Sequence, residues 1–118
     1  MTDLVLCLGA GKGTWAEAYK LIQSESWNKV FLVTNSFGRE KFQAPDNAEF
    51  VLIDDRLPAK EILAQIKNGL TGKISGIEVA VNFVSGAGKE HMALISALLQ
   101  LGFALRLVVL TEKGMEEL

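Results

Sequence analysis

Five short apolar runs alternate with stretches of helical pattern, and this alternation restricts the fold more than any other feature of the chain. The runs are expected to form β-strands over residues 4–8, 29–34, 49–53, 77–84 and 103–110. The first run contains no charged residue, which is typical of a strand covered on both faces. Strands that alternate with helices form a parallel sheet with right-handed crossovers. We therefore predict an α/β fold: one Rossmann-like three-layer sandwich over residues 1–118, with a five-stranded, mainly parallel sheet.

The stretch after the first run predicts an amphipathic helix. Thr14 and Glu17 fit a capping box at its start. Its apolar positions follow the helical spacing i, i+3, i+4 and i+7; they are Trp15, Ala18, Tyr19 and Ile22. After the second run, residues 37–42 predict a short helical turn.

Two further helices follow the third and fourth runs. Pro58 suits the first turn of one helix, which Gly69 and Gly72 are expected to end. The other helix is predicted over residues 89–101, with Gly102 as its stop. It is apolar on more than one face, so it either packs deeply among its neighbours or contacts a second subunit. Residues 111–118 are expected to be a polar tail.

Composition excludes several classes of protein. Hydrophobic residues make up 49% of the 118, and the formal net charge is −2, which argues against duplex nucleic acid bound through a broad basic face. Cys7 and His91 are the only cysteine and histidine, so a Cys/His zinc site is ruled out; Cys7 is expected to be a buried structural thiol. No apolar stretch reaches the roughly 18 residues of a membrane span, and no basic signal peptide is present. We expect a cytoplasmic protein with no metal, no cofactor and no membrane contact.

The expected strand order, 3-2-1-4-5, places strands 1 and 4 side by side where the winding of the sheet reverses. A ligand crevice opens at such a switch point, at the carboxyl ends of the strands. The loops that leave these two strands share one tetrapeptide, Gly-Ala-Gly-Lys, at residues 9–12 and 86–89. Each loop runs into a helix, whose unpaired amides and positive dipole end favour an anion. The alternative is that the glycines only form tight turns.

Neither standard nucleotide motif is present. A P-loop requires a serine or threonine after its lysine, but Gly13 follows Lys12 and Glu90 follows Lys89. The dinucleotide fingerprint fails at its third glycine, which is Thr14 here, and the second strand ends in Asn35 rather than in an acid. A dehydrogenase is therefore not expected.

Other side chains are candidates for catalysis, metal binding or stacking. Ser85 and His91 lie in one loop–helix junction, where His91 could donate to a phosphate or accept a proton. Asp54 and Asp55 end the third strand and either bind Mg²⁺ or form a solvated turn. Trp15, beside the first loop, is either part of the core or a stacking platform.

Residues 81–94 carry a resemblance to a known family. Their sequence, VNFVSGAGKEHMAL, resembles the motif of CARF domains, the CRISPR-associated Rossmann-fold sensors, in which a strand, a Ser/Thr-Gly-Gly turn and a helix follow one another. The helix then ends at Leu101-Gly102-Phe103, before a hydrophobic strand, as it does in that family. The likeness covers nearly the whole chain in topology and about fifteen residues in motif. Gly86-Ala87-Gly88 replaces the commoner glycine pair.

The resemblance implies a homodimer that binds a cyclic oligoadenylate at the loops after strands 1 and 4. Carried over by position, the ligand-binding residues are expected to be Gly9, Gly11, Lys12, Thr14, Ser85, Gly86, Gly88 and Lys89. Gly13 and Asn35 complete the ligand-binding set that we expect at these loops. Some members cleave the ring without metal. In that case Lys89 would stabilise the phosphorane, and Ser85 or His91 would position the attack.

Three functions therefore remain open at this point. The first is a regulatory module that binds a nucleotide or cyclic oligonucleotide, and the second is a metal-independent phosphodiesterase. The third is a structural or interaction subunit without a small ligand. We expect no effector domain after Leu118, so that the chain is a sensor that acts through another protein, a degrader of the messenger, or a relative with a different ligand. A homodimer is expected, formed through the helix over residues 89–101.

Overall fold

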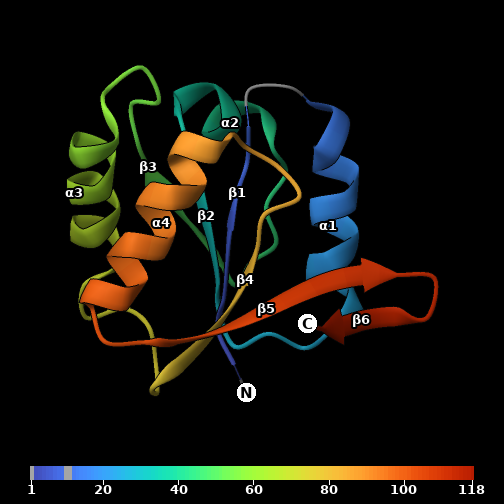
Figure 1. The fold of residues 1–118 in the computed structure, drawn as a ribbon. Coiled ribbons are helices and arrows are strands. Elements are labelled where there is room, and N and C mark those ends of the chain that lie inside the picture. The colour runs from blue at the N-terminus through green and yellow to red at the C-terminus, as the bar shows by residue number, and fades with distance from the viewer. Residues whose placement is uncertain (1, 10–11) are drawn as a thin grey trace.

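The computed structural model describes residues 2–9 and 12–118, and in these residues six strands form one sheet in the order β3-β2-β1-β4-β5-β6 (Figure 1). The strands are β1 Leu4–Cys7, β2 Val30–Thr34, β3 Ala48–Leu52, β4 Glu78–Asn82, β5 Ala104–Thr111 and β6 Gly114–Glu117. Neighbours from β3 to β5 are parallel, whereas β6 runs antiparallel to β5. The α/β class and the Rossmann-like order 3-2-1-4-5 are confirmed, with one strand more than predicted.

Helices cover both faces of this sheet and make the predicted three layers. The helices are α1 Trp15–Ser24, α2 Ser36–Lys41, α3 Ala59–Leu70 and α4 Gly88–Gln100, and a short 3₁₀ helix, η1 Lys12–Thr14, precedes α1. Helices α1 and α2 lie on one face, and α3 and α4 lie side by side on the other (Figure 1). None of the helices in the described part of the chain is long and apolar enough to cross a membrane.

Strand β1 separates two hydrophobic cores because its side chains alternate between the faces. Leu4 and Leu6 pack into the core under α1, whereas Val5 and Cys7 pack into the core under α3 and α4. All four residues are buried. This strand is therefore covered on both faces, as its unbroken apolar run predicts.

The predicted polar tail over residues 111–118 is wrong, because half of it, Gly114–Glu117, forms β6 and Thr111 belongs to β5. A two-residue loop of Glu112 and Lys113 joins β5 to β6, and Gly114 follows at φ +106°. Arg106 of β5 donates to the Glu117 carboxylate over 2.9 Å. Met115 packs against the core under α1, so this hairpin covers the C-terminal part of α1 (Figure 1).

Two local predictions about helix ends are also corrected. Thr14 is the N-cap of α1 but makes no side-chain capping hydrogen bond, so the capping box does not form. Gly69 lies inside α3 rather than ending it, and a Cβ there would approach the Val51 side chain of β3 to 2.5 Å. Gly69 therefore allows close helix–sheet packing, while Gly72, at φ +76°, follows the helix end as expected.

Candidate functional site

The two glycine-rich loops leave β1 and β4 at the same edge of the sheet and touch each other. Strands β1 and β4 pair directly, with Leu6 opposite Asn82. The Gly9 amide donates to Ser85 Oγ over 2.8 Å. A Cβ at Gly9 would lie only 2.9 Å from the Gly86 nitrogen, so the loop backbones are in contact. The predicted meeting of the loops at the switch point is thus observed.

Further hydrogen bonds tie these loops to the helices that follow them. His91, in α4, has Nε2 2.7 Å from the Ser85 carbonyl oxygen. The Trp15 indole, in α1, donates to the Gly9 carbonyl over 3.0 Å. Gly86 has φ +98°, a conformation that favours glycine, and a Cβ there would also crowd His91 and Cys7.

A cleft of about 490 Å³ opens between the loops. Its lining consists of Gly9, Gly13, Thr14, Asp55, Ser85, Gly86, Ala87 and Glu90. Helices α1 and α4 both begin here, and neither N-cap, Thr14 or Ala87, makes a side-chain capping hydrogen bond. No side chain therefore caps the first turn of either helix, although η1 leads directly into α1, and the helix dipoles favour negative charge at this point.

Two carboxylates, Asp55 and Glu90, also line this cleft. Glu90 lies in the first turn of α4. Asp55 follows β3 and accepts a hydrogen bond from Asn35 Nδ2 over 3.3 Å. Their charges oppose those of the helix ends, so the cleft suits a ligand that offers hydrogen-bond donors as well as an anionic group. Neither Asp55 nor Glu90 is among the ligand residues predicted from the sequence. Asp55 reaches the cleft from a loop that is distant in sequence.

A second hollow, of about 590 Å³, adjoins the first along the carboxyl ends of β2 and β3. Asp55 lines both hollows, and Asn35 lines the second. Asn35 also caps α2, where its Oδ1 accepts from the Gly38 amide over 3.0 Å. Together the hollows form a site along the sheet edge that is longer than the predicted crevice.

Charged groups beside the second hollow form a local cluster. Arg56 makes a two-pronged hydrogen bond to Asp54 and holds the pKa of that carboxyl below its usual value. The positive charge of Lys89 makes the smallest contribution to this lowering of the Asp54 pKa. Lys89 is exposed in the first turn of α4 but does not line the first hollow.

The structure brings together only part of the predicted site. Five of the predicted ligand residues line the first hollow: Gly9, Gly13, Thr14, Ser85 and Gly86. Gly88 and Lys89 begin α4 beside it. Gly11 lies outside the described residues; Lys12 begins η1, and its side chain is not described.

The candidate catalytic groups have defined places within the loops. Ser85 is 2% exposed, and its oxygen accepts the Gly9 amide. His91 contacts the Ser85 backbone and packs against Phe83, with ring centroids 4.8 Å apart. These contacts hold the loops in place. The catalytic roles of Ser85, His91 and Lys89 stay predictions.

Cys7 lies beneath the loops as a buried thiol. Burial, with a smaller contribution from the negative charge of Glu90, raises the pKa of Cys7 to about 12. The thiol is therefore protonated near neutral pH and is a poor nucleophile. Within residues 2–9 and 12–118, no three His, Cys, Asp or Glu side chains gather in a way that could hold a metal ion.

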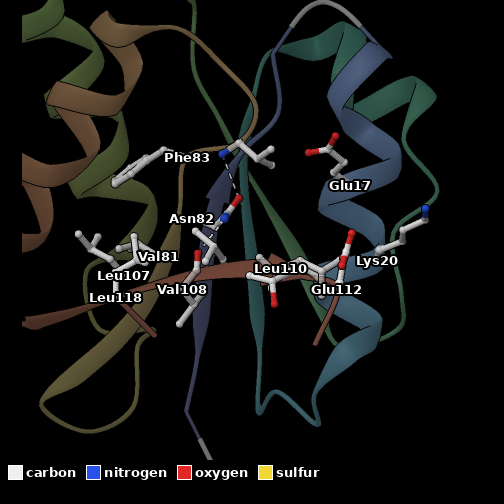
Figure 2. Close-up of a pocket in the computed structure, with 14 residues that line it drawn as sticks. Glu17, Lys20, Val81, Asn82, Phe83, Leu107, Val108, Leu110, Glu112 and Leu118 are labelled. Carbon is white, nitrogen blue, oxygen red and sulfur yellow. Dashed lines mark hydrogen bonds between the residues drawn. The ribbon is translucent and has the colours of Figure 1, made fainter. Parts of the chain in front are cut away.

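A larger, mostly apolar groove of about 870 Å³ lies on the α1 side of the sheet (Figure 2). It opens where β5 diverges from β4, whose pairing ends at Val81 and Leu107. Asn82 bridges the gap, since its Nδ2 donates to the Val108 carbonyl over 2.8 Å. Figure 2 shows Glu17 and Lys20 of α1 on one side and Phe83 on the other. This groove was not predicted from the sequence.

Comparison of the sequence with protein-family models and with curated proteins finds no match.

Proposed function

We propose that this chain is a regulatory module that binds a phosphate-bearing ligand, a nucleotide or cyclic oligonucleotide, at the cleft between its two glycine-rich loops. The observation that carries the proposal is that two helices, α1 and α4, begin at one glycine-lined cleft, and that no side chain caps either helix. First-turn amides of α4 can bind phosphate oxygens, and the positive dipole end of α1 adds to the attraction. The glycines let the backbone approach a ligand closely.

The carboxylates of the cleft support a nucleotide over inorganic phosphate. Asp55 and Glu90 would repel a bare anion, whereas they can accept hydrogen bonds from ribose hydroxyls or from an amino group. The adjoining hollows of about 490 and 590 Å³ provide space for such a ligand along the sheet edge. The CARF-like motif over residues 81–94 supports an oligoadenylate in particular.

The binding unit that we propose is a homodimer formed through α4. Met92 and Leu99 are 71% and 59% exposed on this helix, and the partly buried Ile95 lies between them. A self-complementary apolar stripe of this kind fits the two-fold interface of a homodimer. Because α4 begins at the cleft, such a dimer would join two clefts in one assembly.

Titration calorimetry tests the ligand. We expect cyclic tetra-adenylate or cyclic hexa-adenylate to bind, and the Lys12→Ala/Lys89→Ala variant to bind about tenfold or more weakly, since each lost cation removes on the order of 1 kcal/mol. Lys29→Ala/Lys113→Ala is the matched control, because Lys29 is exposed at the amino end of β2 and Lys113 lies in the β5–β6 loop. No heat with either ring, or equal weakening in the control, would count against the proposal.

A further inference from the structure

Three hydrogen bonds connect α4 to α1 through both glycine-rich loops. They run from His91 to the Ser85 carbonyl, from the Gly9 amide to Ser85 Oγ and from the Trp15 indole to the Gly9 carbonyl. We infer that Ser85 and His91 are positioning residues: these three hydrogen bonds, called the lock below, hold the two loops together as one unit. When the lock breaks, the environment of the Trp15 indole changes. The inference does not depend on the proposed ligand.

Burial makes the lock strong. Ser85 and Trp15 are buried, whereas Gly9 and His91 are partly buried, so water has limited access to these hydrogen bonds. A buried donor or acceptor that loses its partner is costly, and chains of hydrogen bonds reinforce one another. Both backbone polar groups of Gly9 are used within the chain. Because a carbonyl only accepts, His91 Nε2 must carry the proton in this contact.

Packing prevents one loop from shifting alone. Gly9 approaches the backbone of Gly86 so closely that a Cβ would not fit, and Gly86 in turn lies against His91 and Cys7. A displacement of the second loop therefore moves the Ser85 acceptor away from Gly9, and this displaces the acceptor of Trp15. Close-packed interiors transmit such shifts rather than absorb them.

The lock ends at an aromatic cluster on α1 and α2. The ring of Trp15 lies 6.0 Å from that of Phe37 and 5.8 Å from that of Phe42, and Tyr19 also packs against Phe42. Tyr19 and Phe37 are exposed at the surface. A change in the loops can thus reach a surface on the opposite face of the sheet from α4.

Trp15 fluorescence and amide exchange test this inference in a Trp27→Phe background, where Trp15 is the only indole. In Ser85→Ala and His91→Leu we expect a red-shifted Trp15 emission and about tenfold faster exchange of the Gly9 amide, consistent with one lost buried hydrogen bond. His91→Gln keeps a donor near the Nε2 position and should restore both signals. Ser24→Ala is the matched control, because its hydroxyl bonds the Leu21 carbonyl at the other end of α1.

A structural role in general stability would speed exchange throughout the sheet, whereas the lock predicts a change confined to the loops. The inference is overturned if Ser85→Ala and His91→Leu leave the Trp15 emission and the exchange rate of the Gly9 amide unchanged. It is also overturned if His91→Gln changes these two signals as much as His91→Leu does. If Ser85→Ala fails to fold, the exchange rate of the Gly9 amide is measured in the Trp27→Phe protein instead. A rate as fast as that of an open loop contradicts the lock.

Discussion

At the scale of single residues, glycines in this chain serve different purposes that their sequence context does not distinguish. Gly86 and Gly114 have positive φ, a conformation that favours glycine even where there is room for a side chain. Gly9 and Gly69 instead have ordinary φ but sit where another segment leaves no room for a Cβ. The second kind depends on tertiary contacts and is therefore invisible in a single sequence.

Gly9→Ala should destabilise the fold by about 1–3 kcal/mol, the usual cost of overpacking, because the new methyl would press on the rigid backbone of Gly86. Gly13→Ala is the matched control in the same loop, since nothing lies within 4 Å of the Cβ it would add. That change should be neutral or slightly stabilising. Urea denaturation of the two variants measures the difference; equal midpoints would mean that the loops do not press together.

Much of the candidate site was predictable at this scale, but its charge was not. The order of the strands places Gly9, Ser85 and Gly86 at one edge, and the structure confirms that they lie together. The Ser85–Gly9 hydrogen bond and the approach of Asp55 depend on side-chain directions that no periodicity encodes. The cleft where we expect an anion is therefore lined by two carboxylates as well, those of Asp55 and Glu90.

At the scale of elements, strong apolar runs predicted five strands well, whereas the sixth was missed. Two of the four residues of β6 are glutamates, so its pattern is that of a solvated tail. Its stability comes from pairing with β5, from the Arg106–Glu117 contact and from the packing of Met115. The Lys113-Gly114 pair is the one local turn signal that could have indicated this hairpin.

The hairpin should depend on Gly114 for conformational reasons alone. An alanine there would have open space but would keep φ near +106°, which costs an L-residue about 1–2 kcal/mol. Gly114→Ala should therefore speed amide exchange in the ladder that pairs Leu110 with Met115 by about five- to thirtyfold. Lys113→Ala, in the same loop, should leave these rates unchanged. Equal amide exchange rates in Gly114→Ala and Lys113→Ala would show that the positive φ of residue 114 does not limit the stability of the hairpin.

At the scale of the whole molecule, the exposed apolar residues are unevenly distributed. Strand β5 and the groove beside it are only partly covered by the described chain, which continues from β5 into β6 (Figure 1). On the other side, α4 presents Met92 and Leu99 to solvent. The apolar excess of the predicted helix over residues 89–101 thus divides between the core and an exposed surface stripe, the stripe on which the proposed dimer rests.

Sedimentation of the protein and two variants tests the proposed dimer. We expect the unmodified chain to sediment as a dimer and Met92→Glu/Leu99→Glu to sediment as a monomer. A two-fold interface would place four carboxylates together and remove four apolar contacts, which should weaken association by about a hundredfold or more. Ile77→Glu is the matched control, because Ile77 is 79% exposed just before β4 and does not belong to the α4 stripe. A monomer in the unmodified protein, or dissociation by Ile77→Glu alone, would show that the α4 stripe does not join two copies.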